Sequence, residues 1–137
     1  MKITVTDDFS ACAAIRRRVF IEEQNVPEDL ELDEFDATAL HLLATCRGRP
    51  IGTARLLIAG DSAKIGRVAV LPEARGTGAG VALMRAALDE LRARGVRVAK
   101  LGAQTHAIGF YERLGFTAHG PEYDDAGIPH RDMTLAL

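Results

Sequence analysis

The sequence predicts a mixed α/β fold, in which one central mixed sheet carries helices on both of its faces. Three observations support this. Strand patterns joined by short turns fill residues 39–71, a strand–glycine turn–helix–strand unit spans residues 63–101, and helical patterns flank both regions. A chain of 137 residues can bury a sufficient core without disulfides or metals. Its length also predicts a single domain over residues 1–137.

The first strand is expected at Lys2–Thr6, where apolar and polar residues alternate. A helix should follow, because Cys12, Ile15 and Val19 recur at steps of three and four residues and form one apolar stripe. This helix should end shortly before Pro27, since the position before a proline disfavours helical geometry.

Three strands are expected next, at residues 39–46, 51–59 and 63–71, with turns at 47–50 and 60–61. Strands that follow one another through such short turns pair in antiparallel fashion. The N-terminal half of the sheet is therefore expected to be an antiparallel meander.

A β-α-β unit should follow the meander. The helix at residues 78–94 has an apolar stripe and ends at Gly95, and a strand is expected at 96–101. This strand should lie parallel to the strand at 63–71, with a right-handed crossover. A second helix is expected at 104–114, then a short strand near Phe116 and a last strand at 131–137.

Composition argues against several classes of function. The 17 basic and 19 acidic residues give a net charge of −2, whereas a general nucleic-acid binder carries a basic excess. Cys12 and Cys46 match neither a disulfide framework nor a zinc pattern, and the histidines do not cluster at ligand spacing, so no metal is expected. No membrane-spanning apolar run and no secretory h-region are visible, so we expect a cytoplasmic protein without membrane or nucleic-acid partners.

Residues 22–36 form the most lopsided charge segment, with eight acids and no base. Together these acids would attract a cationic molecule, although a solvated acidic loop explains them equally well. Salt would confine the attraction to about 8 Å at physiological ionic strength.

The most informative stretch is the glycine-rich turn that follows the strand residues 68–70. Glycines at 76, 78 and 80 place no Cβ between an anion and the backbone, and the turn opens a helix whose first N–H groups lack partners. Such a turn binds phosphate. A Walker A loop would need a Lys followed by Ser or Thr, and a dinucleotide fingerprint would need G-x-G-x-x-G in a first strand–helix turn. The sequence has neither, so another phosphate-bearing ligand is expected.

Three segments carry a resemblance to a known family. The turn reads Arg75-Gly76-Thr77-Gly78-Ala79-Gly80 and resembles the R/Q-x-x-G-x-G/A motif with which GCN5-related N-acetyltransferases (the GNAT superfamily) hold the pyrophosphate of acetyl-coenzyme A. The second signature of that superfamily, F-Y-x-x-x-G-F, resembles Phe110-Tyr111-Glu112-Arg113-Leu114-Gly115-Phe116. The segment at 18–27, with Asp33 and Asp36 after it, is similar to the ElaA-like branch. The resemblance spans nearly the whole chain and implies the GNAT fold.

The resemblance implies direct transfer of an acetyl group from acetyl-CoA to a primary amine of a small acceptor, in a ternary complex. It also implies that the strand at 63–71 and the next strand separate to admit the pantetheine arm, with a backbone N–H near Val70 polarising the thioester carbonyl. Gln104 stands where many relatives carry an Asn that contacts this arm. The expected cofactor-binding residues are Val68, Ala69, Val70, Arg75, Gly76, Thr77, Gly78, Ala79, Gly80 and Gln104.

Tyr111 is the expected general acid, because a phenol, with a reference pKa near 10, can protonate a departing thiolate. Its helical spacing from Phe110 and Leu114 also fits a core residue. For the base that accepts the amine proton, Glu23 is the first candidate, since it lies at the helix end of the ElaA-like segment. The other candidates are Glu22, Asp33, Asp36 and His130.

Two other functions stay open on the sequence: a non-catalytic acetyl-CoA sensor domain, and a nucleotide-binding protein that uses the same turn. Turnover with an amine would separate an enzyme from a sensor, and the missing Lys after Gly80 argues against a nucleotide. The acidic segment favours a cationic acceptor. A homodimer is common among members of the superfamily and is implied here by analogy alone.

Overall fold

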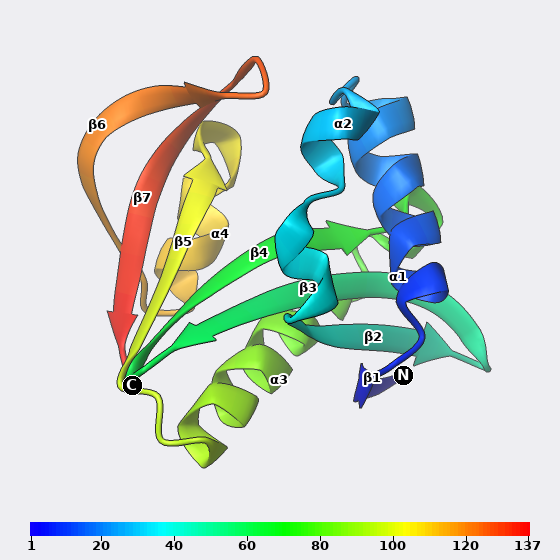
Figure 1. Ribbon diagram of the computed structural model, residues 1–137, viewed down its shortest axis with the longest axis horizontal. Coiled ribbons are helices and arrows are strands. Elements are labelled where there is room, and N and C mark those ends of the chain that lie inside the picture. The colour runs from blue at the N-terminus through cyan, green and yellow to red at the C-terminus, as the bar shows by residue number, and fades with distance from the viewer.

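The computed structural model describes residues 1–137 and contains one seven-stranded mixed sheet with the order β1-β2-β3-β4-β5-β7-β6 (Figure 1). The strands are β1 (Lys2–Thr6), β2 (Leu40–Cys46), β3 (Arg49–Ala59), β4 (Ser62–Val70), β5 (Val98–Gln104), β6 (Thr117–Asp125) and β7 (Ile128–Ala136). The main helices are α1 (Phe9–Arg16), the π-helix η1 (Arg17–Glu23), α2 (Glu28–Glu31), α3 (Ala79–Ala93) and α4 (Ile108–Arg113). Three 3-10 turns are η2 (Glu34–Ala37), η3 (Pro72–Ala74) and η4 (Thr105–Ala107). None of the helices combines the length and apolar character needed to cross a bilayer.

The antiparallel meander and the parallel unit predicted from the sequence are both confirmed. Strands β1 to β4 pair in antiparallel fashion, and β4 pairs with β5 in parallel across the α3 crossover. The β4–β5 pairing covers only residues 62–64 against 98–100. Beyond these residues the two strands diverge, as Figure 1 shows, and they leave an opening in the middle of the sheet.

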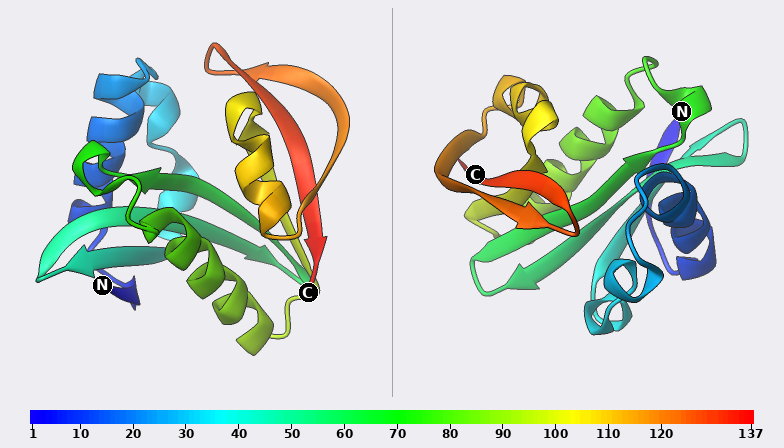
Figure 2. Two further views of the ribbon diagram at one scale, coloured as in Figure 1. Left: turned by 180° about the vertical axis from the view of Figure 1, so that it is seen from behind. Right: turned by 90° about the horizontal axis from the view of Figure 1, so that it is seen from above.

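Helices cover both faces of the sheet (Figure 2). The larger core lies between the sheet and α3, where Leu83, Met84 and Leu91 are fully buried. A smaller apolar cluster, which includes Cys12 and Ile15, lies on the other face beneath α1. The opening between β4 and β5 can therefore be reached from a face covered by α1 and η1 and from a face covered by α3 and α4.

Strand β4 carries a bulge halfway along its length. Its pairing with β3 shifts between Thr53↔Ala69 and Arg55↔Gly66, so β4 holds one extra residue there. Arg67 lies in this bulge with a φ of 51°, a left-handed value that is uncommon for a side chain other than glycine. A bulge of this kind bends its strand, and it lies in the part of β4 that no longer pairs with β5.

Several element boundaries differ from those expected. Strand β5 runs two to three residues later than predicted, because its pairing with β7 extends to Gln104↔His130. The helix expected at 104–114 is consequently shorter and consists of η4 and α4. Strand β6 is nine residues long rather than short, and β7 begins at 128 rather than 131. The length of β6 was underestimated because it is an exposed edge strand that lacks the alternation of a half-buried one.

Candidate active site

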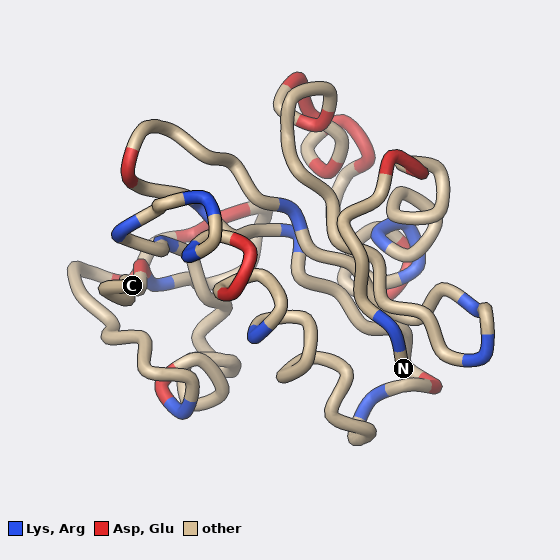
Figure 3. The backbone as a smooth tube through the Cα atoms, turned by 90° about the horizontal axis from the view of Figure 1, so that it is seen from below, with Lys and Arg blue, Asp and Glu red and all other residues tan.

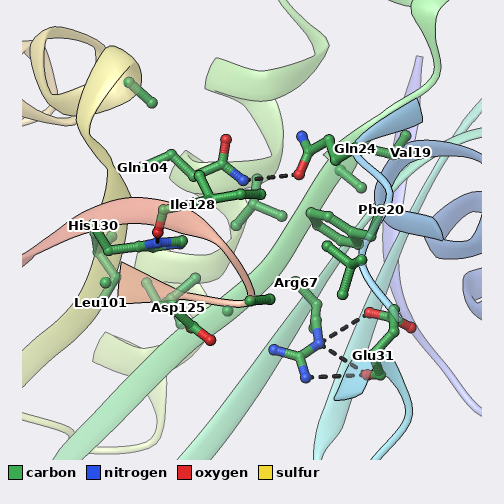
Figure 4. Close-up of a pocket in the computed structure, with 18 of the residues that line it drawn as sticks. Val19, Phe20, Gln24, Glu31, Arg67, Leu101, Gln104, Asp125, Ile128 and His130 are labelled. Carbon is green, nitrogen blue, oxygen red and sulfur yellow. Dashed lines mark hydrogen bonds and ion pairs between the residues drawn. The ribbon is translucent and has the colours of Figure 1, made fainter. Parts of the chain in front are cut away.

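A cavity of about 770 Å³ lies where β4 and β5 separate. Its walls come from these two strands, from η1 and α2 on one side and from the β6–β7 hairpin on the other. Figure 4 shows side chains from these separate elements, among them Gln24, Gln104 and His130, converging on the same space. The cavity therefore joins segments that lie more than a hundred residues apart in the chain, from Val19 to His130.

The glycine-rich turn beside the cavity presents free backbone donors. The N–H groups of residues 76–81 have no acceptor within the protein. Gly76 and Gly78 have φ values of 79° and 86°, which favour glycine, and Gly78 precedes the first residue of α3 without any side-chain cap. Six consecutive free donors at the start of a fifteen-residue helix fit a phosphate-bearing group.

The edge of β4 that faces the opening pairs with no other strand beyond Lys64. The N–H of Leu71 donates to Ile51 O of β3 at 2.9 Å. Because successive residues of a strand point their backbone groups to alternate sides, the N–H and C=O of Val70 face the opening. An amide-rich ligand arm could therefore bond to β4 as an added strand would.

An ion pair joins the glycine turn to η1. Both terminal nitrogens of Arg75 donate to the Glu23 carboxylate at 2.7 Å, and Arg75 Nε donates to Val70 O at 3.1 Å. The hydrogen bond from Arg75 lowers the pKa of Glu23, and the Glu23 carboxylate raises the pKa of Arg75. The guanidinium is thus held against the edge of β4, next to the free donors of the turn.

A second contact crosses the opening one residue further along η1. Gln104 Nε2 donates to Gln24 Oε1 at 2.9 Å (Figure 4). His106 Nε2 lies 2.7 Å from Gln104 Oε1. The end of β5 and the end of η1 are thereby tied together over the cavity.

Tyr111 reaches the cavity from α4, on the face of the sheet that α3 covers. Its ring packs edge-on against Phe110 and Phe116, with centroid distances of 5.0 and 6.1 Å. Burial raises the pKa of Tyr111 to about 12. The phenol therefore stays protonated at physiological pH, and its hydroxyl has no acceptor within the protein.

Comparisons with known proteins agree with this geometry. The model of the acetyltransferase (GNAT) domain family matches residues 5–137. The chain belongs to the GNAT acetyltransferase family. Protein ElaA of Escherichia coli (strain K12) is 33% identical over 128 residues, which cover 90% of this chain and 84% of ElaA. YjcF of Bacillus subtilis (strain 168), named as an uncharacterized N-acetyltransferase, is 34% identical over 87% of this chain and 86% of its own.

Solved structures agree as well. An acyl-CoA N-acyltransferase from Pseudomonas aeruginosa superposes with a TM-score of 0.87 at 31% identity, covering 98% of this chain and 99% of that one. The crystal structure of E. coli ElaA superposes with a TM-score of 0.85 at 28% identity, covering 97% and 96%. The GNAT fold and the resemblance to the ElaA-like branch are thus confirmed, and the protein is an acyltransferase.

The GNAT fold brings most of the expected site residues together around the cavity. Those that line the cavity are Glu23, Val68, Ala69, Val70, Arg75, Gln104 and Tyr111. Gly76 to Gly80 lie beside the cavity, at the start of α3, and do not line it. Among the other candidates for the base, His130 lines the cavity, whereas Glu22, Asp33 and Asp36 do not.

The acidic segment is largely neutralised by arginines from other elements. Arg16 and Glu31 pair in the interior, where they are 1% and 2% exposed. Burial alone would raise the pKa of Asp36, but hydrogen bonds from Arg16, the Asp33 backbone and Arg55 lower it to about 2. Arg67 donates to Asp33 at 3.3 Å and to the Glu31 backbone carbonyl at 3.0 Å.

The acidic segment is therefore more than a free acidic surface. The acids that pair with arginines are Glu23, Glu28, Glu31, Asp33 and Asp36. Glu22, Asp29 and Glu34 have no ion pair, and Figure 3 shows the acidic positions of this segment gathered on one side of the molecule. The sequence did not reveal the pairing because the arginines come from several separate segments, which are α1, η1, β3, β4 and the turn before α3.

Sequence reasoning also missed several cavity residues. Arg67, His106, Tyr123 and Asp125 line the cavity, and none of them belongs to a motif. The left-handed backbone at Arg67 and the extra length of β6 could not be read from residue pattern alone.

Proposed function

We propose that the protein transfers an acetyl group from acetyl-CoA to a primary amine of a small acceptor, by direct attack while both are bound. The observation that carries this proposal is the row of six free N–H groups at the start of α3, beside a cavity at the β4–β5 opening. A GNAT family member needs both parts, one for the phosphates and one for the reacting groups.

We assign the cofactor to the turn and the two strand edges. The backbone of residues 76–81 would bind the pyrophosphate, with Arg75 adding positive charge. The free edge at Val68 and Val70 would bind the amide-rich arm, and Gln104 would contact the arm from β5. When bound, acetyl-CoA supplies an acetyl group already activated as a thioester. A Cβ at Gly78 would meet no atom within 4 Å, so a substitution there acts through backbone strain and through the space left to the ligand.

Tyr111 is assigned as the general acid. Its buried phenol keeps its proton and has no competing acceptor, so the hydroxyl is available when negative charge develops on a departing sulfur. The N–H of Val70 would stabilise the charge that develops on the carbonyl oxygen.

Glu23 fits a positioning role better than the role of a base. Both of its carboxylate oxygens accept hydrogen bonds from Arg75, and its lowered pKa makes it a weak proton acceptor. The base role expected from the sequence stays a prediction that Glu23→Gln can test.

A small cationic amine is the acceptor we favour. Glu31 in the cavity wall is neutralised by arginines, but Asp125 lines the cavity without an ion pair. Its carboxylate could attract an ammonium group to the side of the cavity formed by the hairpin.

The test combines binding with turnover. Acetyl-CoA at about 100 times its dissociation constant should stabilise the protein by roughly 2.7 kcal/mol, which raises the midpoint of thermal unfolding by on the order of 10 °C. CoA release on addition of small cationic amines should follow. Binding without turnover would favour the sensor, and a larger shift with ATP or NAD would favour a nucleotide-binding protein.

Tyr111→Phe sharpens the assignment of the acid. We expect kcat to fall about 10²- to 10⁴-fold, because general acid catalysis is lost, while the thermal shift with acetyl-CoA is retained. Phe110→Leu, on the same turn of α4, is the matched control for packing. Full activity in Tyr111→Phe would show that the phenol does not act as the acid.

A further inference from the structure

His130 occupies a central place on the cavity wall. In the sheet it lies between Gln104 of β5 and Tyr123 of β6, its direct partners in the two ladders. Residues directly opposite in a ladder place their side chains on the same face. Because Gln104 bonds to Gln24, the residue that follows η1, this is the face covered by α1 and η1. Figure 4 shows the His130 ring directed into the cavity.

The hydrogen bonds of His130 determine its tautomer. Nδ1 lies 2.7 Å from the carbonyl oxygen of Ile128. A carbonyl oxygen can only accept, so Nδ1 must carry a proton. In the neutral ring, Nε2 then holds a lone pair, and no group of the protein donates to it.

The ring is also held in place by its neighbours. It stacks on Tyr123 with a centroid distance of 5.9 Å and an interplanar angle of 23°. The Tyr123 hydroxyl donates to Asp132 Oδ1 at 2.8 Å, which fixes the stacking partner in turn. His130 is therefore an oriented imidazole with a free acceptor nitrogen at the cavity.

We propose that Nε2 of His130 is the base that accepts the proton of the acceptor ammonium, which makes His130 a catalytic residue. The proposal rests on the acetyl transfer proposed above. An imidazole suits this task because it changes charge near neutral pH. Glu23, in contrast, has both oxygens occupied by Arg75.

The base and the acid would reach the reaction from opposite faces of the sheet. His130 lies on the face covered by α1 and η1, whereas Tyr111 packs against the core beneath α3. An amine that enters from the side of His130 would meet the thioester in the opening, and the sulfur would depart toward Tyr111. Because β4 and β5 diverge beyond residues 64 and 100, groups from both faces of the sheet can reach the opening between them.

The protons balance in this scheme. One proton passes from the ammonium to His130 Nε2 and then to solvent. The amine nitrogen then forms the amide C–N bond while the thioester C–S bond breaks, and Tyr111 gives its hydroxyl proton to the sulfur. The second proton lost by the nitrogen restores the Tyr111 hydroxyl, so one proton is released per turnover of an ammonium.

Several titratable groups surround His130 and bear on its pH dependence. They are Tyr123, Asp125 and Asp132 on the hairpin, His106 on η4, and the Glu31–Arg67 pair across the cavity. Burial and the Asp132 carboxylate raise the pKa of Tyr123 to about 12, so this phenol does not titrate in the range of an assay.

The first test uses the protein without ligands. Nitrogen–proton correlation spectra of isotope-labelled protein, recorded at mildly alkaline pH, should show His130 with a protonated Nδ1 and a bare Nε2. The signals are assigned by their absence in His130→Asn. A proton on Nε2 of the neutral ring would overturn the proposal.

The second test is kinetic. The Asn side chain in His130→Asn retains an N–H donor for the Ile128 carbonyl but removes Nε2. We expect kcat/KM for the acceptor to fall about 10²- to 10⁴-fold at neutral pH. The deficit should shrink as the pH rises, because the amine then loses its proton to water, while the thermal shift with acetyl-CoA stays unchanged.

The outcomes separate the two proposals. A wild-type rate in His130→Asn, or a loss that is the same at every pH, would overturn the role of His130 while the wild-type enzyme still turns over. If the wild-type protein acetylates no amine at all, the proposed function itself fails. Glu23→Gln is the comparison variant, and the pH dependence of its kcat/KM should match that of the wild-type protein. If Glu23→Gln instead shows the rate deficit that shrinks as the pH rises, the base is Glu23.

Discussion

Two groups of arginine–carboxylate pairs hold the same acidic segment, and they differ in burial. In the first, Arg16 and Glu31 are 1% and 2% exposed and are joined by Asp36. In the second, the Arg75 and Glu23 side chains are 42% and 40% exposed at the edge of the cavity. The first fastens α2 and η2 to α1, whereas the second faces the space that we assign to ligands.

The difference shows how one kind of interaction can serve two purposes. Arg16 uses its three nitrogens on the Glu31 carboxylate at 2.9 Å, Asp36 at 2.7 Å and the Glu31 carbonyl at 2.8 Å. Buried charges satisfied in this way are costly to separate, because the remaining partner stays out of water. The exposed Arg75–Glu23 pair stays in contact with water, so it contributes little to stability and is available to orient Arg75 beside the turn.

The largest expected effect comes from breaking the buried group. Arg16→Met keeps the volume but leaves Glu31 and Asp36 with one arginine fewer, and we expect the free energy of unfolding to fall by about 3–5 kcal/mol. The control is Arg17→Met in the adjacent position, whose half-exposed pair with Glu28 should contribute less than about 1 kcal/mol. Urea denaturation of both variants measures the contrast, and equal losses would contradict it.

An effect of intermediate size on the free energy of unfolding is expected at acidic pH. The pKa of Asp36 is lowered to about 2, so its stabilising contribution is complete above its ordinary value near 3.8 and is lost as the pH falls toward 2. The shift corresponds to about 2 kcal/mol of unfolding free energy over this interval. Unfolding free energies measured from pH 5 downward should fall more steeply in the wild-type protein than in Asp36→Asn. Parallel pH dependences would show that Asp36 is not held in its charged form.

The parts of the fold that sequence reasoning predicted are those with a local signal. The glycine turn, the apolar stripe of α3 and the short turns of the meander each specify their own geometry. The long β6 strand had no such signal, because an exposed edge strand has no apolar face to alternate. The 3-10 turn η2 and the helix α2 within the acidic segment are held by tertiary ion pairs and could not be foreseen either.

The site residues that the sequence predicted are likewise those that belong to a local motif. Tyr111 and Arg75 belong to motifs, and both line the cavity. The state of Glu23 and the tautomer of His130 depend on partners that folding brings to them, Arg75 in one case and the Ile128 carbonyl in the other. The sequence shows which side chains can accept a proton, but their hydrogen bonds in the folded protein determine which of them has a free lone pair.

The smallest expected effect on stability comes from the exposed pair. Glu23→Gln should change the free energy of unfolding by less than about 1 kcal/mol, because both side chains remain in contact with water. The variant should nevertheless weaken acetyl-CoA binding on the order of tenfold, about 1.4 kcal/mol, since an unpaired Arg75 must be ordered when the ligand binds. Titration calorimetry with acetyl-CoA measures this loss, and kcat at saturating acetyl-CoA should be unchanged. A fall in kcat with unchanged binding would mean that the exposed pair serves the chemistry directly, and the positioning role of Glu23 would then be wrong.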